Sequence, residues 1–403
     1  MKFAILLIIN TFIAISGWAA ENVLWQSDIL AKPYINARLG SFTEKGLKEV
    51  ALMSARDLEV HSFQAGKLHQ IAKVSFLKSF EPLRLNRFDL QNDGRDELIV
   101  SGLSNGRAQS IIYSLQSGVF KPVSEVPYYV SVIGGDLDNQ LIGQKKFGAA
   151  VYSGVPFALQ VKGSQLVEGE SLLNQKGIWA KNIPLYSMNR FKTEDGHLSW
   201  AIADSEGYIA MYESGLANKM GGTGGSFGGS VFHIDSEVRN VLNELVSAHI
   251  EIPLRQLFDN GLGLRDYRDL SLSQTKVICD DRDQTLWHPP CLPESQRAAA
   301  IVATQAEPLL YVVKSEDYLK NIVGARPAIK QARLMALKWN GHSLQEAWSS
   351  LSFEGGIADF DLAQWDDDAP QEVLILNTIR GNGYWETQKG LRSQLIVINK
   401  KSE

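Results

Sequence analysis

A short acidic loop near residue 90 holds the residues best suited to chemistry in this chain. Oxygen-bearing side chains stand at its first, third, fifth and ninth positions, a glycine at the sixth, and a backbone carbonyl at the seventh. This arrangement suits a hard cation such as calcium. The spacing leaves two interpretations open, a calcium site and an acidic β-turn that binds nothing. The residues at these positions are Asp89, Gln91, Asp93, Gly94, Arg95 and Glu97.

The loop leads into a short apolar run, and similar runs recur along the chain. Each run is brief, rich in β-branched residues and continuously apolar, which is typical of a strand buried on both faces. The first three lie about 45 residues apart, the length of one four-stranded propeller blade. The runs are 49–53, 97–101, 140–144, 199–203, 299–303 and 372–376. We therefore predict an all-β fold, a β-propeller of six or seven blades.

Two stretches interrupt the repeat. Residues 231–250 carry apolar residues at helical spacing, which predicts a short helical insertion. Residues 262–297 are polar and irregular and contain the only two cysteines of the chain, Cys279 and Cys291. In an exported protein this pair is most economically a disulfide that closes a loop; a zinc site completed by His288 is the alternative. Both insertions either line a binding rim or are tolerated decoration.

The N-terminus has the features of a secretory signal. Lys2 precedes an apolar run over 3–15, and small residues lead to a cleavage site after Ala19. An uncleaved membrane anchor is the alternative, but the apolar run is shorter than the ~20 residues that a spanning helix needs. We expect residues 1–19 to be removed. Residues 20–403 then form one propeller domain in the periplasm or outside the cell, with no transmembrane span.

Composition and motifs weigh against nucleic-acid binding and against catalysis. The 403 residues have a formal net charge of −5, which argues against a nucleic-acid surface. The sequence has no G-x-S-x-G, no H-E-x-x-H and no P-loop lysine, and the glycine-rich stretch 221–230 lacks a phosphate-binding Lys. The adjacent acids at 366–368 are a poor glycosidase pair, because carboxyls in a turn stay solvated.

The pattern D-x-x-x-D-G-x-x-E before an apolar strand resembles the VCBS and FG-GAP repeats of integrin-like β-propellers. The resemblance is specific over 89–100 and 356–376 and positional elsewhere. The resemblance implies a six- or seven-bladed propeller with calcium-binding loops. Carried over by position, it implies calcium ligands at the side chains of Asp89, Gln91, Asp93 and Glu97 and at the carbonyl of Arg95.

Weaker copies of the loop occur at both ends of the chain. In the last repeat Ala369 replaces the glycine, so that turn is costlier. In the first repeat Lys45 stands at a ligand position, and we expect that loop to keep its turn without a metal. The ligand positions of the last repeat hold Gln364, Asp366, Asp368 and Glu372, and those of the first hold Ser41, Thr43, Lys45 and Glu49.

The sequence favours a binding module over an enzyme. Residues 23–27 echo 347–349, which suits a ring whose first and last segments share a blade and leave no free sheet edge. We expect a noncatalytic exported propeller that binds a protein or glycan partner, with calcium as a structural cation. A polysaccharide hydrolase or lyase on the same scaffold and an envelope-assembly scaffold are the alternatives. Convergent acids or a histidine with perturbed pKa values would indicate an enzyme.

Overall fold

Antiparallel strands are the main element of this chain. The structure is a computed structural model, and no α-helix occurs within the segments that it describes. Those segments are residues 23–133, 140–147, 154–163, 165–171, 185–192, 198–203, 208–213, 251–253, 309–317, 329–339, 344–363, 372–379 and 392–399. The signal sequence, both insertions, Cys279, Cys291 and the run 299–303 lie outside the described residues, so their predictions stay predictions.

The first two sheets are four-stranded antiparallel meanders with their strands in sequence order. The first sheet contains β2 (Tyr34–Gly40), β3 (Glu49–Ser54), β4 (Asp57–Gln64) and β5 (Lys67–Ser75). The second contains β6 (Phe80–Phe88), β7 (Glu97–Ser104), β8 (Arg107–Gln116) and β9 (Val119–Val126).

Two-residue turns fix the register of these hairpins. Both residues of each turn have positive φ, the combination that matches the twist of the flanking strands. Glycine always takes the second position, where it adopts this conformation without a steric penalty. The turns are Ala65-Gly66, Asn105-Gly106 and Ser117-Gly118.

Three further sheets continue the pattern. The third contains β10 (Tyr129–Ile133), β11 (Gln140–Gln144), β12 (Phe157–Lys162) and β13 (Gln165–Ser171). The 3-10 turn η1 (Leu185–Ser187) precedes the fourth, which contains β14 (Met188–Lys192), β15 (Leu198–Ala203), β16 (Tyr208–Glu213) and β17 (Glu251–Pro253). The fifth contains β18 (Leu309–Asp317), β19 (Ile329–Trp339), β20 (Leu344–Ser349) and β21 (Phe353–Glu354), which pairs with β19.

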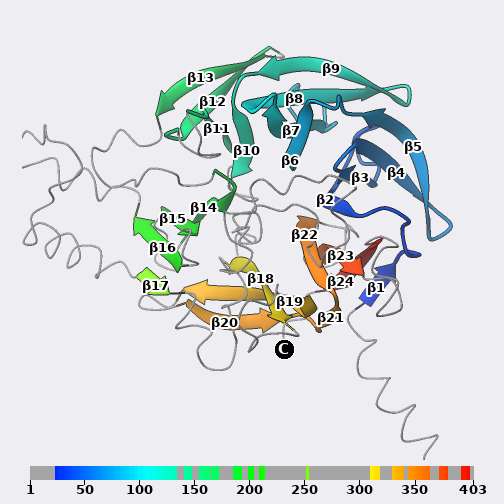
Figure 1. The fold of residues 1–403 in the computed structure, drawn as a ribbon, viewed down its shortest axis with the longest axis vertical. Coiled ribbons are helices and arrows are strands. Elements are labelled where there is room, and N and C mark those ends of the chain that lie inside the picture. The colour runs from blue at the N-terminus through cyan, green and yellow to red at the C-terminus, as the bar shows by residue number, and fades with distance from the viewer. Residues whose placement is uncertain are drawn as a thin grey trace, which may run out of the picture.

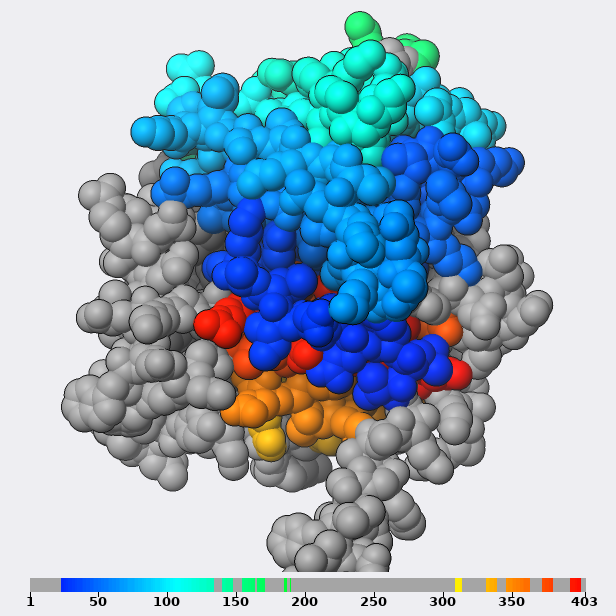
Figure 2. Space-filling model, turned by 90° about the vertical axis from the view of Figure 1, so that its right-hand side faces the viewer, coloured from blue at the N-terminus to red at the C-terminus, as the bar shows by residue number. Residues whose placement is uncertain are grey.

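The sixth sheet joins the two ends of the described chain. Its strands are β22 (Gly356–Ala363), β23 (Glu372–Ile379), β24 (Arg392–Asn399) and, outermost, the N-terminal β1 (Val23–Gln26). Figure 1 shows the sheets following one another around a common centre. In Figure 2 the dark blue N-terminal residues pack directly against the orange and red residues of this last sheet. The predicted sharing of one sheet by the first and last segments is confirmed.

Apolar packing between neighbouring sheets explains why the short runs form strands. Five of the predicted runs become the second strands of their sheets, β3, β7, β11, β15 and β23. In β3 every residue is buried, which confirms a strand covered on both faces. The core of the first sheet, including Ile35 and Leu52, is continuous with Leu98 of the second and Leu374 of the sixth. Each sheet therefore depends on its neighbours to bury its faces.

The loops of the meanders alternate between two rims, because successive strands are antiparallel. Loops that follow the first or third strand of a sheet lie on one rim, which we call the β2–β3 rim. Loops that follow the second or fourth strand, including β3–β4, β5–β6 and β11–β12, lie on the other, which we call the β5–β6 rim.

Candidate functional site

The predicted cation loop, between β6 and β7, is closed by hydrogen bonds among its own residues. The Asp89 carboxylate accepts the backbone N–H groups of Asp93 at 3.1 Å and Gly94 at 2.8 Å. Gly94 has a φ of 84°, in the left-handed region that favours glycine. The Asp93 carboxylate accepts the backbone N–H of Arg95 and pairs with its guanidinium group, and these interactions lower the pKa of Asp93.

Glu97, the first residue of β7, ties the start of this loop to the sheet. Its side chain is buried, and its two carboxylate oxygens accept the backbone N–H of Leu90 at 2.8 Å and the side-chain amide of Gln91 at 2.7 Å. Burial raises the pKa of Glu97, although both hydrogen bonds act in the opposite direction. Glu97 therefore acts here as a buried structural acceptor.

The loop between β2 and β3 has the same geometry with fewer acidic residues. The Glu49 carboxylate accepts the backbone N–H groups of Phe42 and Thr43, each at 2.8 Å, and the hydroxyl of Thr43. Ser41 takes the place of the leading aspartate, and its hydroxyl accepts the N–H of Gly46 at 3.2 Å. This loop keeps the turn, as its sequence predicts.

These two loops also contact each other on the β2–β3 rim. The N–H of Asp96 donates to the carbonyl of Ser41 at 2.7 Å, and the N–H of Ser41 donates to the Asp96 carboxylate at 3.1 Å. The Lys45 side chain lies against Gly94, so closely that a Cβ atom added there would collide with it. The repeat loops therefore join neighbouring sheets.

The residues of the second loop retain oxygen acceptors for a cation, but they are not gathered as a metal centre. An ionised carboxylate offers about four lone-pair positions, so the hydrogen bonds leave capacity on Asp89 and Glu97. Within the described ranges, no group of three or more His, Cys, Asp or Glu side chains is placed to hold a metal ion. Calcium binding stays a prediction.

The predicted sites near the C-terminus are described in part. Glu372 begins β23 and is buried, in the position that Glu49 and Glu97 occupy in their sheets. Gln364, Asp366 and Asp368 lie outside the described residues, as do Cys279 and Cys291.

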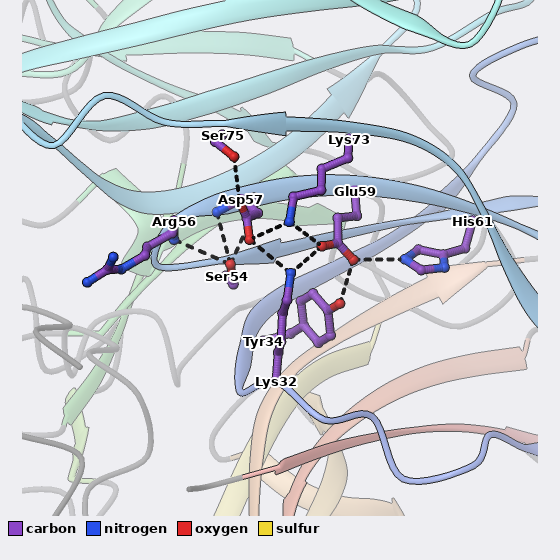
Figure 3. Close-up of polar contacts among 9 residues, drawn as sticks. All are labelled: Lys32, Tyr34, Ser54, Arg56, Asp57, Glu59, His61, Lys73 and Ser75. Carbon is purple, nitrogen blue, oxygen red and sulfur yellow. Dashed lines mark hydrogen bonds and ion pairs between the residues drawn. The ribbon is translucent and has the colours of Figure 1, made fainter.

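A cluster that the sequence analysis did not identify lies at the β5–β6 rim of the first sheet. We call it the rim charge cluster. It consists of Lys32, Tyr34, Asp57, Glu59, His61 and Lys73 (Figure 3).

Two lysines bridge two carboxylates in this cluster. Lys32 Nζ lies 2.9 Å from Asp57 Oδ2 and 2.5 Å from Glu59 Oε1. Lys73 Nζ lies 3.0 Å and 3.5 Å from the same two atoms. The Tyr34 hydroxyl donates to Glu59 Oε2 at 2.6 Å, and His61 Nε2 lies 3.2 Å from that oxygen.

Pairing moves the pKa values of Glu59, Tyr34 and Lys32 away from neutrality. Burial alone raises the pKa of Glu59, but the hydrogen bonds from His61, Lys32 and Tyr34 outweigh it, and the pKa falls well below its ordinary value. Burial and the Glu59 charge raise the pKa of Tyr34. Partial burial lowers the pKa of Lys32, yet its bonds to Glu59 and Asp57 raise it overall. At neutral pH these three groups therefore hold their protonation states.

A second cluster lies where the inner strands of three sheets approach one another. We call it the axial charge cluster. Asp359 Oδ2 accepts hydrogen bonds from Asn36 Nδ2 at 2.8 Å and Arg38 Nη1 at 2.6 Å. Asp359 Oδ1 lies 3.4 Å from Arg84 Nη1. All four side chains are buried, so Asp359 of the last sheet joins the first two sheets at the ring centre.

The sequence contained a partial signal for the rim charge cluster. Asp57, Glu59 and His61 alternate with apolar residues, so they share one face of β4. The antiparallel register then places Glu59 opposite Lys73 and Asp57 opposite Ser75. Lys32 and Tyr34 join from the chain before and at the start of β2, a contact that no local pattern indicates.

Comparisons with known proteins add little. No family model and no curated protein matches this sequence, so the VCBS and FG-GAP resemblance stays a prediction. A chain in a solved structure titled "Crystal Structure of Mitotic Checkpoint Complex" aligns over 94% of this chain and 93% of that chain, with 10% identity and a TM-score of 0.38. No conclusion follows from so low a similarity. Among the described residues, no helix has the length and apolarity needed to cross a membrane.

Proposed function

We propose that this chain is an exported, noncatalytic β-propeller of six or seven blades that binds a protein or glycan partner through one rim. The described residues form six four-stranded antiparallel sheets around a centre, which supports the propeller, as does the pairing of β1 with β24. Export is supported by the charged, apolar and small-residue sequence of residues 1–19.

The observation that carries the noncatalytic assignment is the state of Glu59. A general acid or base needs a pKa near the working pH. Glu59 has the most heavily bonded carboxylate of the rim charge cluster, and its pKa is displaced downward by groups that stay bound to it. Lys32 and Tyr34 are displaced upward. These three groups therefore hold their protonation states at neutral pH and stabilise the sheet.

The β5–β6 rim is the surface that we assign to the partner. Leu77, in the loop between β5 and β6, is 77% exposed, and Phe147, in the loop between β11 and β12, is 61% exposed. Among the described residues these are the two most exposed large apolar side chains, and we assign them to the contact with the partner. Leu77 lies two residues after Ser75, whose hydroxyl donates to the Asp57 carboxylate of the rim charge cluster. Apolar and charged contacts thus lie side by side on this rim.

Calcium has a structural part in this proposal. The oxygen-bearing side chains of Asp89, Gln91, Asp93 and Glu97 support a weak cation site on the opposite rim. A cation there would reinforce a loop that already joins the first two sheets.

The proposal is tested by measuring binding and turnover in the same preparation. The mature protein is incubated with soluble polysaccharides, and both retardation in affinity gels and release of reducing ends are measured; a biotinylated sample is cross-linked to envelope extract. We expect binding without new reducing ends. Leu77→Ser and Phe147→Ser should weaken the binding. Val119→Ser should not, although Val119, on the β2–β3 rim, is 58% exposed. Turnover of a polysaccharide, or loss with Val119→Ser alone, would overturn the assignment.

A further inference from the structure

One arginine at the ring centre has donors available for a further acceptor. Arg84, in the middle of β6, is 6% exposed. A guanidinium group has five N–H donors in a rigid fork. Within the described part of the chain, the one hydrogen bond that this guanidinium group donates is the 3.4 Å contact with Asp359 Oδ1. No Arg84 nitrogen is among the fully buried, unpaired side-chain atoms of the described residues, so its remaining N–H groups reach accessible space and can donate to a further acceptor.

Asp359 does not supply that acceptor, because it is already engaged. Its Oδ2 atom accepts hydrogen bonds from Asn36, from the backbone N–H of Ala37 and from Arg38, which lies closest at 2.6 Å. Two guanidinium groups therefore share one carboxylate, with the shorter contact to Arg38. The local excess is one positive charge, from two arginines and one aspartate.

Two further carboxylates, Asp96 in the loop before β7 and Asp361 in β22, pair with a different arginine. Arg87 Nη1 lies 3.2 Å from Asp96 Oδ2, and Arg87 Nε lies 3.8 Å from Asp361 Oδ2. Asp361 also accepts the backbone N–H of Leu39 at 3.0 Å. The three arginines and three aspartates balance overall; the charge of Asp361 also reaches Arg84, but more weakly than the charges of Asp359 and Arg38.

The electrostatics at Arg84 agree with this distribution of charge. Burial lowers the pKa of Arg84, and the charge of Arg38 acts in the same direction against the opposing effect of Asp359. Tyr186, in η1 before the fourth sheet, also acts on this pKa. Groups from the first sheet, the sixth sheet and η1 therefore act on Arg84 of the second sheet, which places its guanidinium near the ring centre.

We propose that Arg84, supported by Arg38, forms a binding site for a small oxyanion, a carboxylate or phosphate group, at the centre of the ring. The planar fork of a guanidinium group matches two oxygens of such an anion. The anion neutralises the excess charge that Arg38 and Arg84 leave beside Asp359. This site is separate from the β5–β6 rim, so it goes beyond the function proposed above and stands without it.

Titration of the whole mature protein with sodium phosphate and with sodium acetate tests the site. Ionic strength is held constant with sodium chloride, because general screening would otherwise shift the melting temperature. We expect one saturable binding event by calorimetry and a rise in melting temperature beyond that in chloride. Arg84→Gln should weaken the binding at least about tenfold. Arg95→Gln, which changes an exposed arginine on the neighbouring loop, should leave it unchanged.

A response to phosphate alone identifies the phosphate class, and a response to both anions identifies a general oxyanion site. Arg84→Lys retains the charge without the fork and should bind more weakly than the natural protein. If phosphate and acetate act like chloride on the natural protein, the acceptor is water and the proposal is wrong. That comparison needs no variant, so the proposal remains testable even if Arg84→Gln does not fold.

Discussion

Glu49 and Glu97 occupy the same position in successive sheets, and each carboxylate closes the loop before it. Each residue begins the second strand of its sheet, and its Oε2 accepts the N–H of the residue seven positions earlier at 2.8 Å. The loops share this bond although Lys45 in one stands where the other has Asp93. The repeated glutamate, with a glycine at positive φ, is therefore enough to shape the loop.

Calcium is expected to strengthen the second loop without being required for folding. Calorimetry of the chelated mature protein should show saturable heat on adding calcium, with a higher melting temperature, because binding to the native state alone stabilises it. Asp93→Ala should remove both effects, while Ser41→Ala in the first loop should not. Absence of heat at millimolar calcium would contradict the site, and unfolding on chelation would contradict the role of the hydrogen bonds.

Asp359→Asn is expected to destabilise the ring strongly. The change leaves Arg38 and Arg84 buried without a negative partner, and removing one member of a buried ion pair costs about 3–5 kcal/mol. Urea denaturation measures the loss. Asp93→Asn is the matched control, since Asp93 pairs with Arg95 on an exposed loop and should leave the midpoint unchanged. Equal midpoints for the two variants would show that Asp359 does not hold the sheets together.

Glu59→Gln is expected to lower stability in a pH-dependent way. Near pH 7 the change should cost about 2 kcal/mol, because Lys32, Tyr34 and His61 lose a charged acceptor. The folded pKa of Glu59 lies below its ordinary value of 4.5. Its stabilising contribution is therefore present above that value and is lost as pH falls toward the folded pKa. The difference in unfolding free energy between the two proteins should shrink toward about pH 3. A constant difference would indicate that charge is not the cause.

Local patterns predicted the strands well, because a strand that is buried on both faces is a short, continuously apolar run in the sequence. The run 97–101 became β7 and the run 372–376 became β23, each beginning at its predicted glutamate. The two charge clusters were not predicted. Arg38 and Asp359 are separated by 321 residues, so no pattern near either one indicates the pair. Period-two alternation placed Asp57 and Glu59 on one face, but only the ring brings Lys32 to them.

The cysteine pair is expected to form a disulfide in the exported protein. Cys279 and Cys291 are close in sequence, and an oxidising compartment favours their pairing. Thiol titration of the denatured, secreted protein should find no free thiol, and reduction should release two. Two free thiols before reduction would contradict the disulfide, and zinc in the same sample would favour the alternative with His288.

Trp25→Ala is expected to loosen the closure of the ring. The Trp25 indole packs edge-on against Phe63 with ring centroids 5.2 Å apart, and its Nε1 donates to the Gly66 carbonyl at 2.8 Å. These contacts hold β1 against the first sheet while β1 pairs with β24 of the last. Trp25 is partly exposed, so the loss should be about 2 kcal/mol, below that of a fully buried tryptophan. Urea denaturation measures this loss of unfolding free energy.

Amide exchange tests the closure itself: in Trp25→Ala it should become faster in β1 and β24 and stay slow in β7. Leu24→Ala, the neighbouring and more exposed change, should alter neither. If Trp25→Ala leaves exchange in β24 slow, the indole does not secure the shared sheet.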